Sequence, residues 1–190
     1  QYLYGLQIAP IASIEHGKGL QCAFFGWADT FDGLLVSPIS FAFHGDCLQV
    51  GLLSISGMLR GSTATFGQIS IINFSGIAPR FQAGLFNAGE ARFSPAGPAR
   101  YIQVGFGNLS GTLILDEELG TKGKGNIVQL ASYTQCGFVN VTDGCSYSDS
   151  IKIAGNQFGF VNVTNGSRSR TQRRNLQCGL FNYLEFDDTR

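Results

Sequence analysis

The stretches Gln82-Ala-Gly-Leu-Phe-Asn87 and Gln177-Cys-Gly-Leu-Phe-Asn182 are two copies of one six-residue pattern, Gln-x-Gly-apolar-x-Asn. Three more copies begin at Gln103, Gln135 and Gln157. A short pattern that recurs along a chain is typical of stacked copies of one small structural unit. The motif therefore predicts a repeat architecture, and it carries no sign of a catalytic centre.

Looser copies precede these five. The copy at Gln49 keeps the glycine but has Ser54 in place of asparagine, whereas the copy at Gln68 keeps Asn73 but has Ser70 in place of glycine. Gln7 and Gln21 retain little beyond the glutamine and its apolar neighbours, and Leu35 stands midway between Gln21 and Gln49, where a glutamine would fall. The long gap from Gln103 to Gln135 predicts an irregular copy around residues 127–133.

The apolar residues of the motif alternate with the period of two that a strand imposes. If residues 81–87 form one straight strand, Phe81 and Leu85 lie on one face and Phe86 on the other. Large apolar groups on both faces indicate a sheet that is covered on both sides. The asparagine, which tolerates the left-handed conformation, is expected in the turn that follows the strand.

Stacked copies would place identical amides about 4.8 Å apart, where they can form hydrogen-bonded ladders. The expected fold is all-β, a β-solenoid or a stack of β-arches, with a two-sheet β-sandwich as the alternative. The predicted structural ladder consists of Gln49, Gln68, Gln82, Gln103, Gln135, Gln157 and Gln177, together with Asn73, Asn87, Asn108, Asn140, Asn162 and Asn182.

The repeats suggest one β domain over residues 1–190. Degenerate repeats occupy 1–66, clearer repeats 67–184, and a short acidic tail 185–190. Longer units are expected to carry loops at 89–100, 110–125, 143–155 and 164–175, where most of the charge is found.

Composition limits the partners. Lys and Arg balance Asp and Glu at 13 each, and charged residues make up only 14% of the chain, so nothing favours nucleic acid. No apolar run reaches the roughly 20 residues needed to span a bilayer. The chain begins at Gln1 without a leader, as an exported protein does after signal removal. An extracellular or cell-surface location follows as the expectation.

Cysteine and asparagine offer the candidate covalent sites. In an exported protein an odd cysteine count allows two internal disulfides and one thiol for a partner, and the candidates are Cys22, Cys47, Cys136, Cys145 and Cys178. Their spacing matches no metal site. Asn-x-Ser/Thr sequons make a covalent glycan conceivable at Asn73, Asn108, Asn140, Asn162 and Asn165, of which Asn165 is expected to be the most accessible.

The sequence offers no catalytic constellation. His16 and His44 are the two histidines, no G-x-S-x-G elbow is present, and the Gly120–Gly125 run lacks the ending of a P-loop. We therefore expect neither an enzyme nor a metal or cofactor site.

The units at 82–87 and 177–182 resemble the surface-repeat family of exported bacterial proteins, which carry tandem VQ-x-GL-x-N copies. The resemblance extends over roughly residues 48–184 and implies an envelope or secreted location more than an activity. In size and cysteine content the chain is also similar to the amyloid-like sheath proteins that surround some filamentous archaea.

Two functions remain open at this point. Strands that are apolar on both faces, and terminal repeats without evident caps, predict a homopolymer that grows by β-sheet addition into a filament, sheath or surface layer. The alternative is a monomer or small oligomer that binds a glycan or host protein through its inserted loops.

Overall fold

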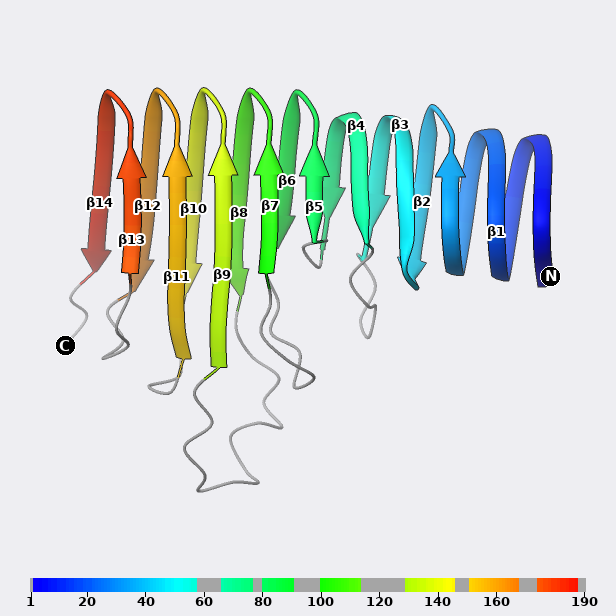
Figure 1. The fold of residues 1–190 in the computed structure, drawn as a ribbon, viewed down its shortest axis with the longest axis horizontal. Helices are drawn as coiled ribbons and strands as arrows, with labels where there is room; N and C mark the ends of the chain where they lie inside the picture. Colours follow the sequence, from blue (N-terminus) through cyan, green and yellow to red (C-terminus); the bar gives the residue numbers. More distant parts are fainter. Residues whose placement is uncertain are drawn as a thin grey trace, which may run out of the picture.

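A computed structural model describes residues 2–57, 66–76, 80–90, 100–113, 129–145, 151–167 and 174–187 (Figure 1). In this part of the chain every regular element is a β-strand. The strands are β1 (Tyr2–Val36), β2 (Ile39–His44), β3 (Cys47–Ser56), β4 (Gly67–Ser75), β5 (Phe81–Ala83), β6 (Phe86–Glu90), β7 (Arg100–Val104), β8 (Gly107–Leu113), β9 (Gln129–Cys136), β10 (Val139–Cys145), β11 (Ile151–Phe158), β12 (Val161–Ser167), β13 (Arg174–Cys178) and β14 (Phe181–Asp187).

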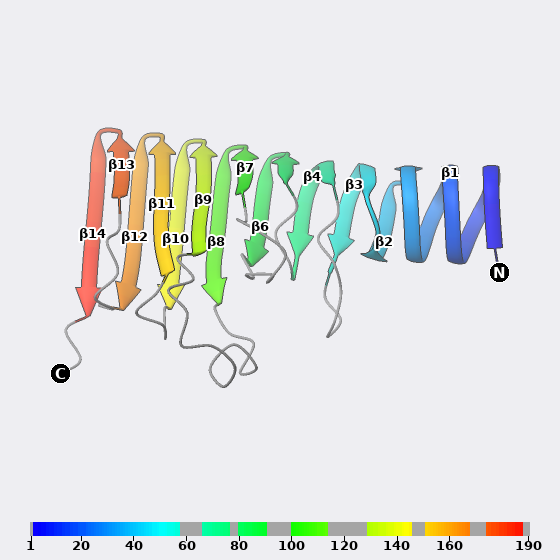
Figure 2. The ribbon, with the colours of Figure 1, turned by 60° about the horizontal axis from the view of Figure 1, so that its bottom comes forward.

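The strands form one parallel sheet that is folded over on itself. From β4 onward its order is β13-β11-β9-β7-β5-β4-β6-β8-β10-β12-β14, so β4 joins two flanks that lie back to back (Figures 1 and 2). The strands β1, β2 and β3 pair with one another, and β3 pairs with β4. From β5 onward each coil contributes one strand to each flank, and the pairings between coils are parallel. The chain is therefore a β-solenoid, as its repeats predict, and the sandwich alternative is set aside.

The six-residue motif forms a turn between two strands, which corrects the prediction of a single straight strand. In the copy at Gln135, β9 ends at Cys136, Gly137 and Phe138 make the turn, and β10 begins at Val139. Because the chain reverses at the glycine, Gln135 and Asn140 both point inward from opposite flanks. The asparagine thus lies within a strand and not in the turn that follows it.

The turn glycine is required by the coil beneath it. A Cβ atom on Gly137 would lie 2.1 Å from the carbonyl oxygen of Gly105 and 2.5 Å from Nδ2 of Asn108. The glycines at positions 84, 105, 159 and 179 are equally crowded. Close stacking of successive turns, which the sequence predicts for the central glycine, is the physical reason for that residue.

Register aligns the repeats in columns, one residue per coil. Gln49 pairs with Gln68, Gln68 with Gln82, and the alignment continues through Gln103, Gln135 and Gln157 to Gln177. The gap before Gln135 contains no additional coil, because β9 pairs directly with β7; the irregular copy expected around 127–133 is therefore wrong. Residues 129–133 belong to β9 itself, and residues 114–128 lie outside the described part.

β1 alone winds through the first coils, and its backbone remains extended from Tyr2 to Val36. Gly5, Gly19 and Gly33, which lie 14 residues apart, have φ values of 115°, 136° and 143°, a region that favours glycine. A Cβ on Gly33 would lie 2.0 Å from the carbonyl oxygen of Gly19. These coils are the minimal unit of two short strands and two tight turns.

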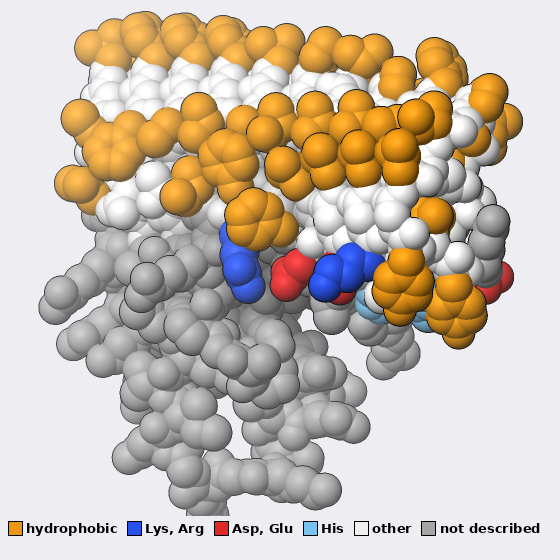
Figure 3. Space-filling view, turned by 45° about the vertical axis from the view of Figure 1, so that its right-hand side comes forward, with side chains coloured by type: hydrophobic (Ala, Val, Ile, Leu, Met, Phe, Trp, Pro, Cys, Tyr) orange, Lys and Arg blue, Asp and Glu red, His pale blue; other side chains and the backbone are white. Residues whose placement is uncertain are grey.

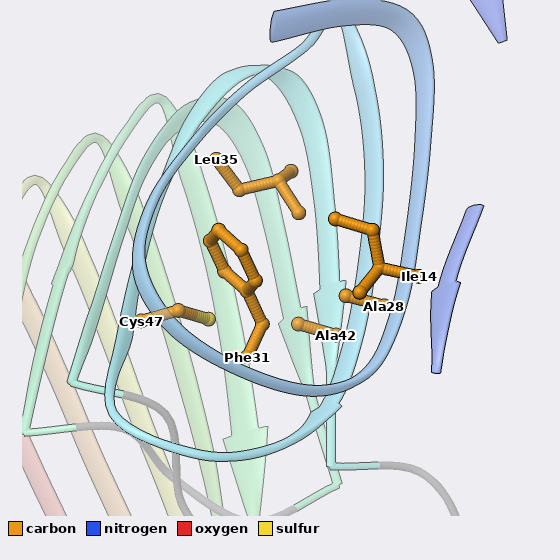
Figure 4. Close-up of a cluster of buried hydrophobic side chains, with 6 residues drawn as sticks. All are labelled: Ile14, Ala28, Phe31, Leu35, Ala42 and Cys47. Atoms are coloured by element: carbon orange, nitrogen blue, oxygen red, sulfur yellow. The ribbon is translucent and has the colours of Figure 1, made fainter. Parts of the chain in front are cut away.

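The interior of the N-terminal coils is apolar. A cluster of buried side chains fills it, and Leu35 occupies the position that glutamine takes in later coils (Figure 4). The members of the cluster are Ile14, Ala28, Phe31, Leu35, Ala42 and Cys47.

All longer connections leave from one edge of the solenoid, which we call the insert edge. The opposite edge, the turn edge, carries only the short turns (Figure 1). The inserts are shorter than the sequence indicates, because β8 continues to Leu113, β10 to Cys145 and β12 to Ser167, while β11 begins at Ile151.

Candidate assembly surfaces

The predicted glutamines form a continuous ladder inside the solenoid. From Gln68 to Gln177, each Nε2 donates to Oε1 of the glutamine in the preceding coil over 2.7–2.9 Å. From Gln49 to Gln157, Nε2 also donates to a carbonyl oxygen six residues later, at 3.2–3.4 Å, on the opposite flank of the same coil. Each side chain therefore links its coil to the previous one and joins the two flanks.

The asparagines form a second ladder that runs the other way. From Asn73 to Asn162, each Nδ2 donates to Oδ1 of the asparagine in the next coil at 2.7–2.9 Å. The same nitrogen donates to a backbone carbonyl at the start of the next turn at 3.0–3.2 Å. These amides close the turns, and the crowding at each turn glycine comes partly from them.

Both ladders end where the motif degenerates. In the described part of the chain, two buried side-chain atoms lack a hydrogen-bond partner: Oε1 of Gln21 and Oδ1 of Asn73. Gln21 precedes Leu35, which has no amide to donate. Asn73 follows Ser54 in its column, and the serine is too short to reach it. Where the early copies depart from the motif, these buried amide oxygens are thus left without a hydrogen-bond donor.

From Gln49 onward the inward columns are polar, and the apolar side chains of the motif point outward. The Gln flank consists of β5, β7, β9, β11 and β13 with the parts of β1, β3 and β4 that continue their columns, and its exposed residues include Ile102, Val104 and Leu176. Along the flank of β6, β8, β10, β12 and β14, the Asn flank, they include Leu109, Phe181 and Tyr183. The prediction of strands that are apolar on both faces and covered on both sides is therefore wrong: the inward face carries Gln and Asn, and the apolar outward face is exposed.

The turn edge is an apolar ridge. Three coils place phenylalanine directly after the turn glycine, and Phe106, Phe138 and Phe160 are 51%, 46% and 41% exposed. Their rings stack face to face, with centroids 5.0 Å and 4.8 Å apart. Phe86 and Phe181 continue the stack edge-on at either end.

The turn edge and the adjoining parts of both flanks carry no charged residue, and we call this region the uncharged half. The ten residues of the inward glutamine column are Gln7, Gln21, Leu35, Gln49, Gln68, Gln82, Gln103, Gln135, Gln157 and Gln177. In each coil, a nine-residue window begins one position before the column residue and ends seven positions after it. None of the ten windows contains Asp, Glu, Lys, Arg or His. The charged residues that the structure describes lie outside these windows, toward the insert edge. In Figure 3, hydrophobic side chains form rows along the solenoid, and the described charged side chains gather below them.

The Asn flank has a shallow depression of about 340 Å³. It arises where Ala88 and Gly107 stand in columns that otherwise carry larger residues, and Phe74, Phe86, Leu109 and Val139 surround it. The outward side chains around it are all apolar, so it suits a hydrocarbon or aromatic side chain and offers no grip for a polar ligand.

Four of the five cysteines are free thiols: Cys22, Cys47, Cys136 and Cys178. The side chain of Cys145 lies outside the described residues. Cys47 is inward and fully buried, and burial, with a smaller contribution from Asp32 and Asp46, raises the pKa of its thiol to about 12. The predicted internal disulfides are thus absent among these four.

Burial divides the sequons. Asn73, Asn108, Asn140 and Asn162 are at most 2% exposed and use their amide nitrogens in the ladder, so a folded coil leaves no room for a glycan there. Asn165 is exposed on β12 and remains a candidate.

Within the described residues, no group of three or more His, Cys, Asp or Glu side chains is placed to hold a metal ion. The same residues include no helix long and apolar enough to cross a bilayer. Comparisons with protein families, with characterised proteins and with solved structures gave no match for this chain.

Proposed function

We propose that this chain is a structural protein that associates with copies of itself through its uncharged half, building a filament, sheath or surface layer outside the cell. The observation that carries the proposal is the uncharged nine-residue window that recurs in all ten coils. Within it, large apolar side chains are exposed on both flanks and on the turn edge.

The size of this surface supports association. Ten coils spaced by about 4.8 Å give a length of about 48 Å, and three residues of each strand give a width of about 10 Å per flank. The two flanks and the turn edge together expose on the order of 1,000 Å², more than the largest apolar patch of an ordinary monomer. One flank buried in each of two copies removes about 1,000 Å² in total, the lower limit for a specific interface, so the turn edge is expected to contribute as well.

The regularity of this surface favours a second copy of the chain over a lipid surface as its partner. Outward rows repeat at the rung spacing of a parallel sheet, so the rows of two copies can interdigitate rung by rung, as they do in steric zippers. A lipid surface would require apolar character but no such regularity. Resistance to heat and protease would come from the two amide ladders, and the extracellular location is proposed from the likeness of the motif to exported surface repeats.

The test compares two lysine substitutions within one coil. Phe138→Lys places a charge on the turn edge, and Asp143→Lys places one at the insert edge. We expect the native chain and Asp143→Lys to form large particles by sedimentation and ordered assemblies by electron microscopy, and Phe138→Lys to sediment as a folded monomer. Circular dichroism checks the fold of each variant. A native chain that stays monomeric at tens of micromolar refutes the proposal, and a monomer that binds phospholipid vesicles would replace it with a lipid-surface role.

The position of the inserts favours a second candidate. The strands that flank the undescribed segments all end at the insert edge, so residues 58–65, 77–79, 91–99, 114–128, 146–150 and 168–173 join the solenoid along one side. Such an edge on a rigid scaffold suits the binding of a glycan or host protein. Deletion of 168–173 should then abolish binding to cells or glycan arrays and leave assembly intact; loss of assembly would instead make this segment part of an interface between copies.

A further inference from the structure

We propose that the Gln flank is a copy-to-copy interface built to carry disulfides, formed between Cys22, Cys136 and Cys178 of one chain and the same cysteines of another. This inference rests on the proposed self-association. It deepens it by naming the face that meets a second copy and the covalent bond that locks it.

The three cysteines occupy a single outward column. Cys136 pairs with Phe158 and Phe158 with Cys178 across the sheet. In the other direction Cys136 pairs with Val104, and the column continues through Ala83, Ile69 and Val50 to Val36. Cys22 lies 14 residues before Val36, the same interval by which Gly33 stacks on Gly19, so it occupies the same column. Three of the five cysteines thus share one column on one face.

Geometry prevents these thiols from pairing within one chain. Cys136 and Cys178 are two coils apart, about 9.6 Å at the spacing of a parallel sheet, whereas a disulfide requires Cα atoms within about 7 Å. Cys22 lies farther still along the stack. Cys178 is exposed, and Cys22 and Cys136 are half-buried, so all three are accessible to a partner. Cys47 is inward and inaccessible.

The surroundings of the column suit a second copy. From Val36 to Cys178 the other members are Val50, Ile69, Ala83, Val104 and Phe158, all apolar and without charge. Two sheets that pack face to face lie about 10 Å apart, and a disulfide can join such sheets, as in immunoglobulin domains. Cysteine is among the smallest side chains of the column, so the flanks can approach most closely where it stands.

Twofold symmetry gives each thiol a partner. An axis parallel to the solenoid places each cysteine opposite its own counterpart, and an axis that lies in the interface at right angles to the solenoid places Cys22 opposite Cys136 or Cys178. Formation of the bond releases two protons and two electrons from two thiols. A small-molecule disulfide such as oxidised glutathione accepts them and leaves as two thiols, through a mixed disulfide.

The experiment treats the assembled full chain with oxidised glutathione and maps disulfides by peptide mass spectrometry after blocking free thiols. We expect covalent dimers joined through Cys22, Cys136 or Cys178, with Cys47 unbonded. The triple variant Cys22→Ser/Cys136→Ser/Cys178→Ser should assemble without forming covalent dimers. Covalent dimers that persist in this variant, or assemblies that yield none from the native chain, overturn the inference.

Two further variants identify the face. Val104→Lys charges the Gln flank and should lower the yield of covalent dimer at least about tenfold, because an unpaired ammonium would be buried in the interface. Val163→Lys charges the Asn flank and should leave that yield within about twofold of the native value, since its ammonium stays outside the interface. The reverse order would assign the interface to the Asn flank. Sedimentation of the reduced native chain separates the two proposals: if it is monomeric, self-association itself fails, whereas assembly without cross-links refutes the disulfide interface alone.

Discussion

Replacing Gln103 by leucine would remove one rung of the inward ladder with little change in volume. Gln103 is fully buried, and its Nε2 donates to Oε1 of Gln82 at 2.8 Å and to the carbonyl oxygen of Leu109 at 3.3 Å. Its Oε1 accepts from Nε2 of Gln135 at 2.8 Å. The substitution therefore leaves the amide oxygen of Gln82 without this donor, and Nε2 of Gln135 with only the weaker bond to the carbonyl oxygen of Val141 at 3.4 Å. A buried polar group without a partner costs about 1–3 kcal/mol, so we expect a local loss of about 2–4 kcal/mol.

Hydrogen exchange measures this loss where it occurs, because long repeat arrays do not unfold in one step. Amides of β5, β7 and β9 should exchange about 30- to 900-fold faster in Gln103→Leu, the factor that corresponds to 2–4 kcal/mol, while amides of β1 should be unchanged. Val104→Thr, an outward change on the same strand, serves as the control and should have little effect. Exchange in Gln103→Leu within threefold of the native rate would show that the ladder does not stabilise the coils.

Three other outcomes follow from the structure. Gly137→Ala should destabilise the coils severely, because its Cβ would lie 2.1 Å from a backbone oxygen. Gly107→Ala should destabilise them only mildly, because its Cβ would meet the movable ring of Phe86 at 3.0 Å. Thermal melts compare the two variants. Cys47 should make the free energy of unfolding depend on pH. Its contribution is present below pH 9 and is lost as the pH rises toward the folded pKa of about 12, because the unfolded thiol ionises first; the loss is about 4 kcal/mol at most. Urea titrations at alkaline pH should show this loss in the native chain and not in Cys47→Ala. If the chain is secreted from a glycosylating host, glycopeptide mapping of the folded product should find sugar at Asn165 and none at Asn140.

The sequence contains enough to predict the stacking but not the path of each coil. Identical amides at a recurring position can be satisfied most simply by one another, and this reasoning leads from Gln82 and Gln103 to a parallel ladder. The period of two was misleading because it continues through Gly84 without a break. Gln82 and Asn87 are five residues apart, so a straight strand would place them on opposite faces, and only a reversal at the glycine brings both inside.

A further feature of the sequence predicts which part of each coil points away from the inserts. The uncharged nine-residue window around each glutamine column position marks the half of the coil that points away from the inserts. The N-terminal coils could not be aligned from the motif alone, because their interior is filled by Phe31, Leu35 and their neighbours in place of amides. Their recurring Gly5, Gly19 and Gly33 hold the 14-residue period where the motif has faded.

From Gln49 onward the coils have a polar interior beneath an apolar exterior, so the forces that hold a coil together differ from those available for contact between molecules. Apolar contact weakens on cooling, because its driving force near room temperature is largely entropic, whereas the amide ladders depend on that force much less. Contacts between molecules would then weaken on cooling more than the winding of each molecule does. Chilling would loosen a bundle of these solenoids into separate, still-wound rods, and warming would gather the rods again without any chain having to refold.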